Sequence, residues 1–125
     1  MNEISEIQRE ILVEGVDDYF GLWEVVWILR RKHPNWTNRQ IRERSLEVLR
    51  PLLESAYIVA GQLGESGSYS KWQLGPVESL ARIDHEWRKL GRDPNMAQIC
   101  WFSNTEKGDE AARASGESNE WVPGK

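Results

Sequence analysis

Residues 99–115 read ICWFSNTEKGDEAARAS, an apolar run that changes within a few positions into a charged segment. The β-branched and aromatic residues at its start predict a short strand over 97–103. The Thr-x-x-Gly sequence at 105–108 then leads into a segment rich in Ala and Glu, which predicts a helix that ends near Gly116. A strand that runs directly into a late helix indicates an α+β chain.

A second strand is expected at 57–63, YIVAGQL, because this stretch is also β-branched and aromatic. The Gly/Ser-rich sequence GESGSYS at 64–70 predicts a loop after it. Between the two strands, residues 76–91 carry an apolar stripe at helical spacing, with Pro76 at the start and Gly91 at the end. We expect the strand at 57–63 to pair antiparallel with residues 99–103.

Helices are also expected before the first strand. Residues 4–15 have isoleucines at helical spacing, and Gly15 can end that helix. In the next helix, Asp17 or Asp18 is the expected N-cap, and Pro34 is expected to end the helix. The apolar residues of this helix cover a broad part of its surface. This breadth predicts a central, buried helix.

A further helical region follows at 37–56, where Thr37 or Asn38 can cap the start. Pro51 removes a backbone hydrogen bond and crowds the preceding turn. Either the helix bends at Pro51, or the region is two helices with Pro51 in the first turn of the second.

The large apolar side chains divide into a predicted core and a set in loops. The expected core contains Trp23, Trp27, Leu49, Leu52, Trp87 and Trp101. The tryptophans in predicted loops, which are left for contact with a partner, are Trp36, Trp72 and Trp121.

The strand and helix around FSNTEKG, at 102–108, resemble the wing regions of MarR- and PadR-type regulators, where aromatic-x-Leu-Thr is followed by x-x-Gly and an amphipathic helix. The resemblance covers residues 20–63 and 98–114. It implies a mostly helical α+β, winged-helix-like domain with a short antiparallel β-hairpin and an extra helix inserted in the wing. The sequence LGRDPNMAQICWF is also similar to small bacterial proteins of unknown activity.

Length and composition limit the number of domains, the expected location of the protein and its attraction to nucleic acid. With 125 residues, the chain is long enough for a single domain, expected over 1–116, followed by a flexible tail at 117–125. Its acidic N-terminus does not resemble a secretory signal, and no apolar run is long enough to span a membrane, so we expect a cytoplasmic protein. The net charge of −4 gives no general attraction to nucleic acid.

Residues that support catalysis are scarce. His85 lacks the second histidine of a zinc-protease helix, and the C-terminal helix dipole explains His33. Cys100 lies in an apolar strand, which predicts a packed thiol rather than a nucleophile. We therefore expect no catalytic residues, no metal and no cofactor.

DNA binding by a winged-helix transcriptional regulator is one of two functions that the charges leave open. Between Arg30 and Arg50 there are seven cations and two acids. The contacts expected for DNA are Arg39, Arg42, Arg44, Arg50, Tyr69 and Lys71. Glutamates interleave with these arginines, however, and ion pairs within the helix explain the pattern equally well.

The function that we favour from the sequence is a non-catalytic, winged-helix-like module that binds another protein. The N-terminal segment contains six acids that would face a basic partner: Glu3, Glu6, Glu10, Glu14, Asp17 and Asp18. An immunity protein that covers a cationic toxin would have such a surface, as would an adaptor that has lost DNA binding. Solubility alone explains the same acidity equally well.

Overall fold

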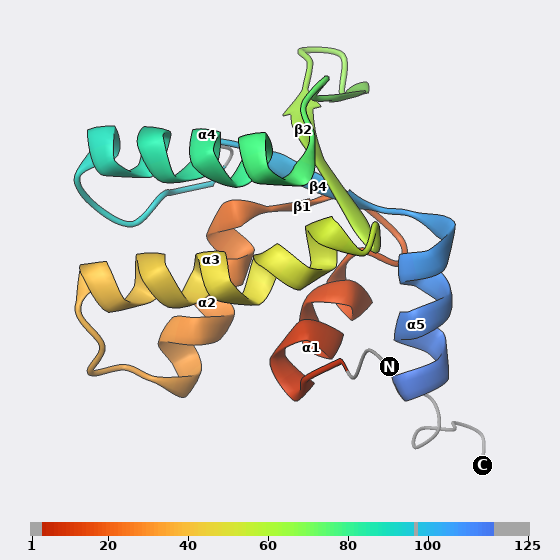
Figure 1. The fold of residues 1–125 in the computed structure, drawn as a ribbon, viewed down its shortest axis with the longest axis horizontal. Helices are drawn as coiled ribbons and strands as arrows, with labels where there is room; N and C mark the ends of the chain where they lie inside the picture. Colours follow the sequence, from red (N-terminus) through yellow and green to blue (C-terminus); the bar gives the residue numbers. More distant parts are fainter. Residues whose placement is uncertain (1–3, 97, 117–125) are drawn as a thin grey trace.

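The computed structural model describes residues 4–96 and 98–116. Within these residues the fold is α+β and mostly helical, as the sequence predicts (Figure 1). The elements, in chain order, are α1 (Glu6–Glu14), β1 (Phe20–Gly21), α2 (Leu22–Lys32), α3 (Asn38–Glu54), β2 (Ile58–Leu63), β3 (Tyr69–Lys71), α4 (Pro76–Leu90), β4 (Trp101–Asn104) and α5 (Glu106–Gly116). The tail at 117–125, with Trp121, lies outside the described residues.

The four strands form one antiparallel sheet in the order β1-β4-β2-β3. The predicted pairing of the two longest apolar stretches is confirmed, with Ala60 of β2 opposite Phe102 of β4. The last predicted strand begins later than expected, at Trp101, because Ile99 has a φ of 74°, which breaks the extended backbone.

The Thr-x-x-Gly sequence joins the sheet to α5. The Thr105 hydroxyl donates to the carbonyl of Ala56 at 2.7 Å and accepts the amide of Gly108 at 3.0 Å, so it caps the helix and ties it to the start of β2. A Cβ at Gly108 would collide with the carbonyl oxygen of Tyr57. Glycine is therefore the residue that lets α5 approach this closely.

The helices pack on one another in two groups. Figure 1 shows α4 running alongside α3, while α1 lies between α5 and the α2–α3 pair. Side chains from α1, α2, α3, α4 and the sheet form one core, in which the fully buried large residues include Ile11, Leu12, Phe20, Leu22, Leu29, Ile41, Leu49, Leu52, Ile83 and Phe102. The predicted burial of Leu49, Leu52 and Trp87 is confirmed.

Two sequence features of α3 concern its start and its last turn. Thr37 caps α3 as predicted, with a reciprocal pair of hydrogen bonds to Gln40. Pro51 lies within α3, which is a single helix, and its carbonyl accepts the Ser55 amide at 3.0 Å. Since Pro51 is in the last turn and exposed, its missing N–H affects only the end of the helix.

The predicted start of the second helix is wrong. Phe20 belongs to β1, opposite Phe102, and α2 begins at Leu22 with Gly21 as its N-cap. The Asp18 carboxylate instead accepts the amide of Tyr19 at 2.7 Å. The predicted loop at 64–70 is also too long, because Tyr69 begins the edge strand β3.

Four expectations for tryptophans need correction. Trp27 is 57% exposed rather than buried, and Trp72 is only 8% exposed although it was expected to be available to a partner. Trp23 and Trp101 are half-buried. Trp72 is held inside because its amide donates to Ala60 and its ring is covered by Arg82.

Candidate functional site

The surface between α1 and α2 combines exposed apolar side chains with two hollows. Trp27 of α2 and Val13 of α1 are 57% and 49% exposed. Hollows of about 310 and 180 Å³ share Glu14, Trp27 and Ile28 in their walls. We call this surface, formed by Val13, Glu14, Trp23, Glu24, Trp27 and Ile28, the Trp27 face.

The geometry of α2 explains why Trp27 is outside. The helix buries Leu22, Val25, Val26 and Leu29, which form one stripe along it. Trp27 points about 140° away from Leu22 around the helix axis, on the side opposite this stripe, and therefore lies outside the core. The Arg31 guanidinium lies 4.5 Å from the centre of the Trp27 ring, a cation–π contact at the edge of the face.

Carboxylates line the larger hollow without a cation. Glu14 and Glu24 both lie in its wall, and neither forms an ion pair within residues 4–96 and 98–116. The pKa of Glu24 is raised, first by burial and then by the negative charges of Glu14 and Asp18, against an opposing backbone hydrogen bond from Gly21. A cation placed here would relieve this repulsion.

The predicted acidic residues are distributed around this face. Glu10 lines the smaller hollow and lies 3.7 Å from Lys32, while Glu14 lines both hollows. Glu6 is exposed on α1, and Asp17 and Asp18 are exposed in the connection to β1. Glu3 lies outside the described residues.

Of the six members of the face, sequence reasoning assigned only Glu14 to a partner surface; Glu24 and Trp27 are the missed residues on which the charge and the apolar contact of the face depend. Glu24 carries a weak signal, since it is an acidic residue in the first turn of a helix, where acids usually serve the helix dipole. The sequence around Trp27 predicts the wrong environment, because an aromatic residue among aliphatic ones is typical of a buried core position.

The predicted DNA contacts on α3 are largely neutralised by neighbouring acids. The three ion pairs are Arg39 with Glu43 at 2.9 Å, Arg44 with Glu47 at 2.8 Å, and Arg42 with Asp84 of α4 at 3.3 Å. Arg50 is exposed and lies in the wall of the groove between α3 and α4. Two of these pairs are exposed pairs within α3 and the third reaches α4, so three of the four predicted arginines already have an acidic partner.

The remaining two predicted DNA contacts, Tyr69 and Lys71, lie on the edge strand β3 and not on α3. The Tyr69 hydroxyl donates to the carbonyl of Val59 at 2.8 Å, and its ring stacks on Tyr19 at 4.7 Å between centroids. Burial raises the pKa of this hydroxyl. Lys71 is exposed at the edge of the sheet. Tyr69 is thus a structural residue here.

Groups that support catalysis or metal binding are dispersed in the described part of the chain. No three side chains among His, Cys, Asp and Glu come together there as a metal site. Cys100 is fully buried, which raises the pKa of its thiol. His33 stacks on Trp36 at 3.7 Å between ring centres, and His85 is exposed on α4.

Comparisons of the chain with protein-family models, with curated proteins and with solved structures found no match. The winged-helix resemblance over residues 20–63 and 98–114 therefore stays a prediction. In the described residues, no helix combines the length and apolar character needed to cross a membrane.

Proposed function

We propose that this chain is a non-catalytic protein-binding module whose Trp27 face docks a basic, amphipathic segment of another protein. The observation that carries the proposal is the exposed Trp27, which stands between two hollows beside Glu14 and Glu24, two carboxylates with no ion pair among the described residues.

The apolar part of the face supplies binding energy. Tryptophan is enriched among the residues that dominate interface energetics, because it buries a large rigid surface at a small cost in conformational entropy. Trp27 and Val13 remain exposed in the isolated chain, so a partner that covers them removes apolar surface from water. The grooved surface between α1 and α2 suits the apolar stripe of a helix.

The carboxylates supply selection by charge. Ionised Glu14 and Glu24 repel each other, and a Lys or Arg from the partner would turn that repulsion into attraction. At the larger hollow an acidic partner would add to the repulsion and is disfavoured, whereas Arg9 and Arg31 line the smaller hollow. An immunity protein or an adaptor acts through contacts of this kind, and we assign the chain to this class rather than to the DNA-binding regulators.

Calorimetric titration with two synthetic amphipathic helical peptides tests the proposal, one built from Leu and Lys and the other from Leu and Glu. The Leu/Lys peptide should bind and the Leu/Glu peptide should not. Trp27→Ala should weaken binding roughly tenfold or more, as truncation of a central interface aromatic does. The double variant Glu14→Gln/Glu24→Gln should weaken binding and flatten its salt dependence.

Two variants elsewhere on the chain are matched controls. Val77→Ala shortens an apolar side chain of α4 that is 68% exposed, and Glu65→Gln removes an exposed charge after β2. Both should leave the affinity unchanged. Equal binding of the two peptides, or an affinity indifferent to Trp27→Ala, would refute the proposal.

A further inference from the structure

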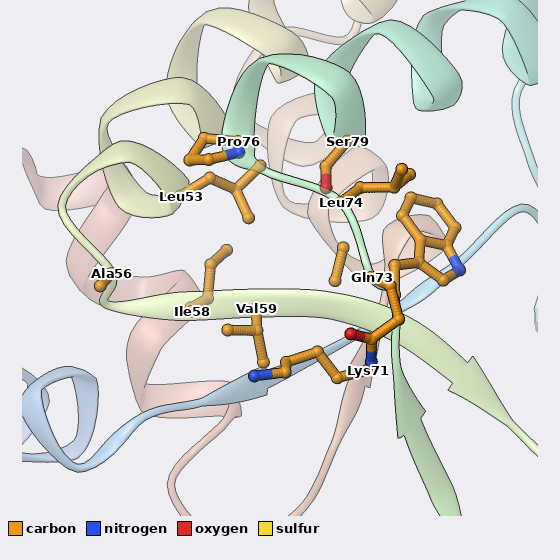
Figure 2. Close-up of a pocket in the computed structure, with 11 residues that line it drawn as sticks. Leu53, Ala56, Ile58, Val59, Lys71, Gln73, Leu74, Pro76 and Ser79 are labelled. Atoms are coloured by element: carbon orange, nitrogen blue, oxygen red, sulfur yellow. The ribbon is translucent and has the colours of Figure 1, made fainter.

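A separate hollow lies at the edge of the sheet, where β3 ends. The β3 strand pairs with Gly61–Leu63 of β2, and the Trp72 amide extends the pairing to the Ala60 carbonyl at 2.9 Å. The chain then leaves the sheet for α4, so the register gives Ile58 and Val59 no strand partner on this side. A hollow of about 400 Å³ remains between this edge, the end of α3 and the start of α4 (Figure 2).

The walls of this hollow are mainly apolar. Leu53 of α3, Ile58 and Val59 of β2, Leu74 and Pro76 all line it. Figure 2 shows Leu53, Leu74 and Pro76 on the side of β2 that faces α4, and Lys71 on the other side, extended along the strand. Its volume lies within the range of small-molecule sites.

Three polar side chains lie in the wall, Ser79, Gln73 and Lys71, of which Ser79 and Lys71 mark the ends of the apolar space. Ser79 of α4 is only 4% exposed, and its hydroxyl points into the hollow in Figure 2. A ligand oxygen that enters the hollow can form a hydrogen bond with this hydroxyl.

Lys71 is the single ionisable side chain in the described wall, and it forms no ion pair with described residues. The N-terminus of α4 already has a negative counter-charge, because Glu78 lies in its first turn. The Glu78 carboxylate folds back over the N-cap residue Gly75, where Oε1 would be 2.8 Å from a Cβ atom if that residue had one. The positive charge available to a ligand therefore comes from Lys71.

We propose that this hollow binds a small apolar monocarboxylate that carries a hydroxyl or carbonyl oxygen at its far end. The hydrocarbon body packs against Leu53, Ile58 and Leu74, and the far oxygen bonds the Ser79 hydroxyl. The carboxylate passes the edge of β2 at Ile58 and Val59 and pairs with Lys71 on the other side of the strand. This site is independent of the Trp27 face, since the two share no lining residue.

Three probes of equal chain length separate the parts of this proposal: omega-hydroxyoctanoate, octanoate and octanol. Titrations are followed by the methyl resonances of Leu53, Ile58 and Leu74 in the full chain. Omega-hydroxyoctanoate should bind most tightly and octanol should bind less tightly than octanoate. Shifts should be saturable and should be largest at these three residues.

Variants assign each end of the ligand. Lys71→Gln should weaken both acids by roughly three- to fivefold, the range of an exposed ion pair, and leave octanol unchanged. Ser79→Ala should reduce omega-hydroxyoctanoate to the affinity of octanoate, and Lys89→Gln, at the other end of α4, should change nothing. The proposal is overturned if the three methyl groups do not shift, if the probes bind alike, or if Lys89→Gln matches Lys71→Gln.

Discussion

Removing the indole of Trp27 should cost about half as much stability as removing that of Trp87, although both lie on amphipathic helices. Trp87 is 2% exposed, and Trp→Ala at a buried site costs about 3–5 kcal/mol. Trp27 is 57% exposed, so less than half of that burial is lost. Loss of the contact with Arg31 adds about 0.5 kcal/mol at an exposed site.

Alanine also favours the helix by a few tenths of a kcal/mol relative to tryptophan, which offsets part of this loss. The expected cost of Trp27→Ala is therefore about 2 kcal/mol, roughly half that of Trp87→Ala. Urea unfolding followed by circular dichroism measures both, and it does not depend on the fluorophores that the substitutions remove. If Trp27→Ala costs as much as Trp87→Ala, then the indole is a core residue and the Trp27 face does not exist as described.

Three further predictions concern charge and accessibility. Because the pKa of Glu24 is raised in the folded chain, ionisation of this carboxyl opposes folding. Glu24→Gln should therefore be more stable than the wild type above the folded-state pKa of Glu24, and this advantage should disappear as the pH falls below the pKa of Glu24 in the unfolded chain. Chemical unfolding at a series of pH values measures the difference, and an advantage that grows in acid would contradict the prediction. Cys100 should resist a thiol reagent in the folded chain and react once urea unfolds it, so rapid labelling of the native protein would contradict its burial. In mobility-shift titrations at physiological salt, DNA should bind no more tightly than in the micromolar non-specific range, because Arg39 and Arg44 are paired with glutamates; tighter binding that Arg39→Ala weakens would favour the regulator.

The sequence predicts the elements whose signals are local. β-Branched and aromatic residues mark β2 and β4, and Thr37 with Gln40 marks the start of α3. The ion pair of Arg39 with Glu43 follows from helical spacing alone. Such features depend on residues a few positions apart, and they are readable without the fold.

The parts that the sequence does not predict depend on tertiary contacts. A helix as broadly apolar as α2 can bury one of several stripes, and packing against α1 and α3 selects the one that excludes Trp27. From the sequence, Phe20 is predicted to lie in the helix that follows, and only the pairing with Phe102 in the sheet shows that it belongs to β1. Glu14 and Glu24 meet only because α1 and α2 pack together.

The location of a bound basic peptide tests the account most directly. Amide and indole resonances of the labelled chain, recorded during titration with the Leu/Lys peptide, report which surface is covered. The Trp27 indole and the residues around Val13 and Glu24 should show the largest shifts, with little change on β3. Shifts centred on α3 or β3, or no saturable shift at all, would contradict the assignment of the Trp27 face as the docking surface.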